Sequence, residues 1–78
     1  MNEQMNKWFD GLTVGEKQEL HQHELNVIQW GWTVFSESGG WRPDPYDTVR
    51  LYTESANVEL TRSQVDYLAK CVKDEDFS

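Results

Sequence analysis

Apolar residues at helical spacing lie near both ends of the chain, and they constrain the fold more than any other feature. Near the start they recur at i, i+3, i+4 and i+7, at Met5, Trp8, Phe9 and Leu12. Near the end the same spacing recurs at Val65, Leu68, Ala69 and Val72. This spacing gathers apolar side chains on one face of an α-helix. The sequence therefore predicts a helix near each end, with an apolar face that needs a partner in the core.

Two capping boxes predict where helices begin. A threonine stands three residues before Glu or Gln at two places, Thr13–Glu16 and Thr61–Gln64. In this motif the threonine oxygen accepts a first-turn N–H, while the side chain three positions later bonds back to the cap. A second helix is therefore predicted over about Val14–Glu24. Alternatively, the first two helical stretches merge, with Gly11 inside them at a cost of about 1 kcal/mol.

The periodicity changes after Asn26, where apolar and polar residues alternate. The alternating apolar residues are Ile28, Trp30, Trp32 and Val34, with Val27 and Phe35 on the opposite face. A period of two in a run rich in β-branched and aromatic residues is typical of a strand. Alternation over Thr48–Glu54 predicts a second strand, and Val58 and Leu60 predict a short third one. The last helix is expected to pack on the sheet face formed by the four alternating residues.

Between the first two predicted strands, Pro43 and Pro45 exclude a helix interior and a central strand. Residues 41–47 are therefore predicted to form a stiff, extended loop. The order of elements predicts an α+β fold: an N-terminal helix or helix pair, a two- to three-stranded antiparallel sheet, and a C-terminal helix packed on the sheet. A chain of 78 residues predicts a single small domain over residues 1–78, with residues 74–78 as a frayed acidic tail.

The chain is acidic: 14 Asp and Glu against 7 Lys and Arg give a net charge of −7. Because nucleic acids and anionic membranes attract basic surfaces, this balance argues against direct binding to either. No apolar run approaches the ~18 residues of a membrane span, and the first residues do not form a secretion signal. A single cysteine excludes an internal disulfide. We therefore expect a cytoplasmic protein, either a monomer or a homodimer.

Few residues have the chemistry of a catalytic or metal site. His21 and His23 form a metal-like pair, but residues two apart on a helix diverge by about 200°. Cys71 is the one thiol, and the sequence places no histidine to activate it. Nucleotide-binding and hydrolase motifs are absent from the sequence. We therefore expect no catalysis and no cofactor, while a small metal-binding or catalytic protein built on these three residues stays open as an alternative.

The segment Trp41–Asp47 is predicted to bind a protein partner. Trp, Tyr and Arg are enriched as interface anchors, and two prolines reduce the entropy lost on binding. The predicted partner-binding residues are Glu37, Trp41, Arg42, Asp44, Tyr46, Asp47 and Glu54. In the alternative interpretation, Trp41 and Tyr46 fold back over the sheet as lids.

The acidic residues are spread along the whole chain. They either confer solubility alone, or form a surface that meets a basic groove which normally holds DNA or RNA. In size, acidity and lack of catalytic motifs, the chain resembles the small accessory proteins with which phages and mobile elements block host enzymes. This class-level resemblance implies an acidic module that occludes a surface of a nucleic-acid-handling or defence enzyme. The alternative is a structural or self-associating module without an inhibitory role.

Overall fold

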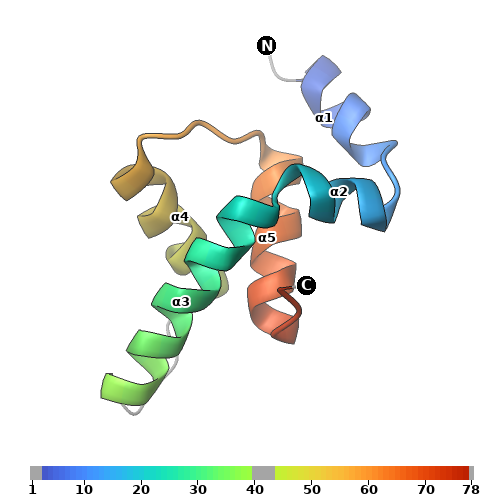
Figure 1. Cartoon of the computed structure of the whole chain (residues 1–78). Helices are drawn as coiled ribbons and strands as arrows, with labels where there is room; N and C mark the ends of the chain where they lie inside the picture. Colours follow the sequence, from blue (N-terminus) through green and yellow to red (C-terminus); the bar gives the residue numbers. More distant parts are fainter. Residues whose placement is uncertain (1–2, 40–43, 78) are drawn as a thin grey trace.

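The computed structural model describes residues 3–39 and 44–77, and within them the chain forms five α-helices and no strand (Figure 1). The helices are α1 (Glu3–Asp10), α2 (Val14–Leu20), α3 (Gln22–Gly39), α4 (Pro45–Ala56) and α5 (Arg62–Asp74). The predicted α+β fold with an antiparallel sheet is therefore wrong. Both longer predicted strands are helices, and the short third one lies in the connection between α4 and α5.

The first predicted strand lies within α3, and its alternating residues point to different sides of that helix. Leu25, Ile28 and Trp32 are buried, and their spacing of i, i+3 and i+7 is helical. Trp30, by contrast, is 71% exposed. A run that is apolar at every second position also contains apolar residues four apart, so both periods fit it. Burial against neighbouring helices decides between them and overrides β propensity.

The second predicted strand lies within α4, and the proline segment before it begins this helix. Asp44 has an extended backbone and its Oδ1 accepts a hydrogen bond from the Tyr46 N–H at 2.9 Å, which makes it the N-cap. Pro45 follows in the first turn, where a helix has no use for the missing N–H. The helix ends at Asn57, whose left-handed backbone turns the chain towards α5.

The helices predicted near both ends are present, and both capping boxes form as predicted. Thr13 and Glu16 exchange hydrogen bonds at the start of α2, and Thr61 and Gln64 do so at the start of α5. The predicted second helix is shorter than expected, because α2 ends at Leu20 and α3 begins at Gln22. The helical axis changes direction at His21, which separates α2 from α3, and residues 11–13 separate α1 from α2.

Helix α5 lies at the centre of the molecule and contacts α1, α3 and α4, while α2 packs on α3 (Figure 1). The core cluster of buried residues is Leu25, Ile28, Trp32, Val49, Leu68, Ala69, Cys71, Val72 and Phe77. The last helix therefore shares the core with Ile28 and Trp32, whereas Trp30 and Val34 are exposed, so the expected packing on all four alternating residues is wrong. After α5, the Asp76 N–H donates to the Cys71 carbonyl at 2.8 Å, and Phe77 is buried.

Candidate functional site

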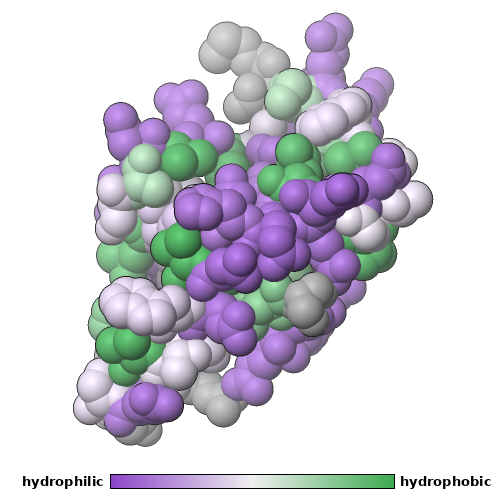
Figure 2. Space-filling model, in the orientation of Figure 1, coloured by the Kyte–Doolittle hydropathy of each residue, from purple (hydrophilic) through white to green (hydrophobic). Residues whose placement is uncertain are grey.

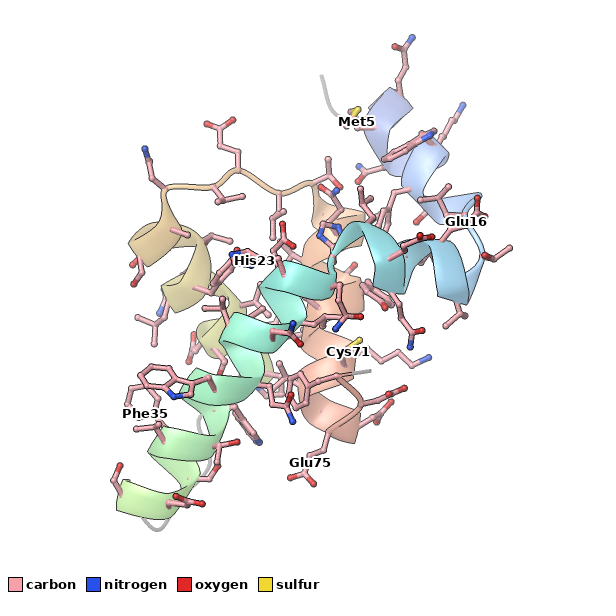
Figure 3. All side chains as sticks on the ribbon, viewed as in Figure 1. Met5, Glu16, His23, Phe35, Cys71 and Glu75 are labelled. Carbon is pink, nitrogen blue, oxygen red and sulfur yellow. The ribbon has the colours of Figure 1, made fainter. Side chains whose placement is uncertain are left out.

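An open groove of about 310 Å³ lies between α3 and α4, and apolar side chains dominate its walls. We call it the α3/α4 groove. It is lined by Val27, Ile28, Trp30, Gly31, Phe35, Thr48, Leu51, Tyr52 and Ser55. Figure 2 shows pale and green side chains gathered at the lower left, over the C-terminal half of α3, and Figure 3 shows Phe35 pointing outwards there. This groove is our candidate functional site.

The groove exists because each of the two helices uses only one face for the core. In α3 the last buried residue of that face is Trp32. Trp30, on another side of the helix, is 71% exposed, and Phe35, beyond Trp32, is 51% exposed. In α4 the buried residue is Val49, and Leu51, two positions later and therefore on another side, is 45% exposed. Exposed apolar patches of this kind mark interaction sites more often than isolated exposed residues do.

Gly31 leaves space at the α3 side of the groove. A Cβ atom placed on this glycine would meet no heavy atom within 4 Å. Glycine in a helix interior costs roughly 1 kcal/mol relative to alanine. The chain thus has a helix-weakening residue at a position where the fold itself would accept a side chain.

The two groove helices are negatively charged. Together α3 and α4 carry Glu24, Glu37, Asp47 and Glu54, and their one Lys or Arg is Arg50. Arg50 Nη2 lies 3.3 Å from Asp47 Oδ1, so this positive charge already has an acidic neighbour. Burial raises the pKa of Tyr52, a lining residue, and the nearby Glu24 carboxylate raises it further. The groove is therefore lined by apolar and neutral side chains, and the two helices that form it carry a net negative charge.

The predicted partner-binding residues do not form one surface with this groove. Trp41 and Arg42 lie outside the described residues. Glu37 lines a separate hollow beside Phe77, and Glu54 is exposed on α4. The remaining three residues, Asp44, Tyr46 and Asp47, lie together at the start of α4.

The start of α4 is tied to α5 by a hydrogen bond. The Tyr46 hydroxyl donates to Asp66 Oδ1 at 3.0 Å, and this bond to the carboxylate raises the Tyr46 pKa. Asp44 and Tyr46 also border a depression on α5 that contains Lys70 and Lys73. Two of the predicted binding residues thus have structural roles: Asp44 caps α4, and Tyr46 links α4 to α5.

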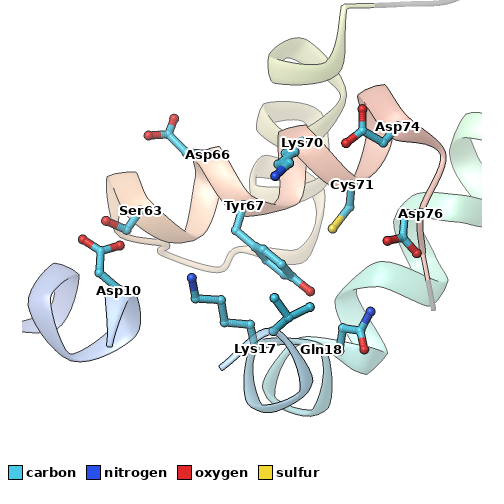
Figure 4. Close-up of a pocket in the computed structure, with 11 residues that line it drawn as sticks. Asp10, Lys17, Gln18, Ser63, Asp66, Tyr67, Lys70, Cys71, Asp74 and Asp76 are labelled. Atoms are coloured by element: carbon cyan, nitrogen blue, oxygen red, sulfur yellow. The ribbon is translucent and has the colours of Figure 1, made fainter. Parts of the chain in front are cut away.

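A second cleft, of about 490 Å³, lies between α2 and α5 (Figure 4). Lys17 lies above the Tyr67 ring, with Nζ 6.0 Å from the ring centroid, and Cys71 borders the same cleft. Burial raises the pKa of the Cys71 thiol, although its contact with the Tyr67 hydroxyl lowers it in part. The thiol is therefore protonated at neutral pH, whereas a nucleophilic cysteine is the thiolate.

The two histidines do not share a site. His21 is buried at 3% exposure, with its ring edge-on to Phe9 at a centroid distance of 5.4 Å, while His23 is exposed. His21 Nε2 lies 3.2 Å from Gln64 Nε2, and burial lowers the His21 pKa. Across residues 3–39 and 44–77, no group of three or more His, Cys, Asp or Glu side chains is placed to hold a metal ion.

The groove was not predicted from the sequence because Trp30 and Leu51 lie in runs that were assigned to strands. A helical projection of residues 22–39 would have separated the two apolar faces of α3, with Trp32 on one and Trp30 on the other.

In the part of the chain that the structure describes, none of the helices combines the length and apolarity needed to cross a membrane. No family model matches the chain, and no curated protein and no solved structure matches it either.

Proposed function

We propose that this protein is a small acidic binding module that covers a surface of a protein partner with its α3/α4 groove. The observation that carries the proposal is Trp30, which is 71% exposed on a helix whose opposite face is buried in the core. Tryptophan is enriched among the residues that dominate interface energies. Phe35 and Leu51 extend the same apolar surface across the two helices.

The net negative charge of α3 and α4 supports a partner with a basic surface. Complementary potentials steer association and disfavour partners of like charge. We therefore propose a nucleic-acid-handling or defence enzyme as the partner, met in the cytoplasm, with its basic surface occluded by this module. The resemblance in size and acidity to phage and mobile-element accessory proteins supports the same proposal.

A second candidate function is self-association. Met5 and Trp8 are about half exposed on α1, and Figure 3 places Met5 and Phe35 at opposite ends of the molecule. Different patches at opposite ends pair head to tail and build open chains. The net charge of −7 on every copy opposes such chains. Sedimentation at low and physiological salt separates a chain-forming protein from a monomer.

The test of the proposed function compares two tryptophans. Tagged wild type, Trp30→Ala and Trp8→Ala would be used to capture a partner from a lysate of the organism that makes the protein. The affinity of the captured partner is then measured with the purified proteins. Because loss of an anchor costs ~2 kcal/mol or more, Trp30→Ala is expected to weaken binding about 30-fold. Trp8→Ala, on α1, is the control and is expected to bind as the wild type does.

Equal binding by wild type and Trp30→Ala would show that the working surface lies elsewhere. The next surface to test would then be the start of α4, through Tyr46→Ala and Asp47→Lys.

A further inference from the structure

We infer that the α3/α4 groove binds an amphipathic helix with basic residues beside its apolar face, supplied by the partner protein. This inference rests on the proposed function, and it adds the shape and the charge of what is bound. The three observations behind it are the walls of the groove, the space at Gly31 and the net negative charge of α3 and α4.

The walls of the groove are helices, and this favours a helix as the bound element. A strand binds by adding to a sheet edge, where backbone N–H and C=O groups are free. Helices satisfy these groups internally, so α3 and α4 offer side chains only. Along α3 the lining extends from Val27 to Phe35, which at 1.5 Å per residue is about 12 Å, or two helical turns. Two turns of a bound helix present apolar side chains at i, i+3 or i+4, and i+7.

The interior of the groove has space for an inserted side chain. Trp30 and Phe35 line the groove from α3, as do Ile28 and Gly31, and Leu51 lines it from α4. Because nothing lies within 4 Å of a Cβ at Gly31, an apolar side chain of the partner can approach the α3 backbone there.

The charges favour a basic partner over a second copy of this chain. The four acids of α3 and α4 outnumber Arg50, whose guanidinium already lies beside Asp47. A second copy of the chain would add its own net charge of −7. Its exposed apolar helix α1 carries Glu3 and Asp10 against one Lys7. Lys or Arg residues beside the apolar face of a bound helix would instead be attracted by the net negative charge of α3 and α4.

The test uses three labelled synthetic peptides of 15 residues and fluorescence anisotropy. The first contains Leu at helical spacing and Lys at the flanking positions. The second has the same composition with the Leu positions permuted, so that no apolar face forms, and the third replaces every Lys with Glu. We expect the first peptide to bind the wild-type chain at least about tenfold more tightly than either of the others.

Filling the groove gives a matched pair of variants. Gly31→Leu places a side chain in the groove, and it is expected to weaken binding of the first peptide about tenfold or more. Gly15→Leu makes the same change on α2, where the Cβ would lie 4.0 Å from Thr13 Oγ1, and it is expected to leave binding unchanged. Both variants are compared with the wild type by thermal unfolding, so that a loss of fold is recognised.

Several outcomes would overturn the inference. If the permuted peptide binds as tightly as the first peptide, binding depends on charge attraction and not on the groove. If the Glu peptide binds as tightly as the first peptide, the bound helix need not be basic. A wild-type dimer that Gly31→Leu dissociates would show that a second copy fills the groove. If no peptide binds while Trp30→Ala still loses the captured partner, the inference fails and the proposed function stands. If the first peptide binds as expected while Trp30→Ala keeps the captured partner, the proposed function fails instead.

Discussion

His21 shows how one buried side chain joins three helices. Gln64 Oε1 accepts the Thr61 N–H at 2.9 Å, so its Nε2 amide group is left to donate to His21 Nε2 at 3.2 Å. This assigns His21 Nε2 as an unprotonated acceptor and places the proton on Nδ1, 3.8 Å from Glu24 Oε1. Protonating the ring would place two donors face to face in a buried site. Burial, which disfavours the charged ring, lowers the His21 pKa.

The lowered His21 pKa predicts a loss of stability on mild acidification. In the unfolded chain the ring titrates near 6.5, while the folded ring holds its proton only at lower pH. The unfolded state therefore binds more protons below about pH 6.5, and stability falls from there towards the folded pKa. We expect urea unfolding at pH 7.5 and 5.5 to show this fall in wild type and in His23→Ala, but not in His21→Gln. An equal fall in all three proteins would assign it to other groups.

Cys71 is expected to be a slow-reacting thiol. It is buried, and burial raises its pKa, so little thiolate is present at neutral pH. Alkylation by iodoacetamide at pH 7.5 is expected to be at least about tenfold slower in the folded protein than in urea. A reaction in the folded state as fast as in urea would restore the interpretation of Cys71 as a reactive residue.

At the scale of elements, α4 depends on the cap that precedes it. Asp44 satisfies the Tyr46 N–H, and loss of such a cap costs roughly 1 kcal/mol. Asp47, one turn later, forms an exposed ion pair with Arg50, and pairs of this kind contribute about 0–1 kcal/mol. Its place in the first turn of α4 adds a favourable interaction with the helix dipole of about 0.3–1 kcal/mol. We expect urea unfolding to show a larger loss of stability for Asp44→Ala than for Asp47→Ala. The reverse order would show that the Asp44 cap stabilises α4 less than the charge interactions of Asp47 do.

At the scale of the whole molecule, stability and the proposed binding use different apolar residues. Leu68 is fully buried on α5, and its truncation to alanine is expected to cost about 2–5 kcal/mol. Trp30 is mostly exposed, and its truncation is expected to change stability by only about 0.5 kcal/mol. A domain of this size has a total stability of roughly 4–12 kcal/mol, so the two variants separate clearly in urea unfolding. A large loss of stability in Trp30→Ala would place this residue in the core and remove it from the groove.

Local signals explain which parts of the fold could be predicted from the sequence. Capping boxes act over three residues, so Thr13 and Thr61 determined two helix starts by themselves. Asp44 and Pro45 mark a third helix start of the same local kind. It was missed because the two prolines were interpreted as excluding a helix interior and a central strand, which left an extended loop. The apolar spacing in α1 and α5 is purely helical, which is why both helices were predicted correctly.

The candidate site depended on tertiary structure instead. Trp30 and Trp32 are the same residue type two positions apart, yet one is 71% exposed and the other 7%. Alternation and helical spacing both fitted this run, and neither specifies which face is covered. The sequence alone determined the negative charge, the exclusion of an internal disulfide and the capped helix starts. Only the packing of α3 and α4 on α5 decided which aromatic side chains became core and which formed a groove, because burial joins faces that lie far apart in the sequence.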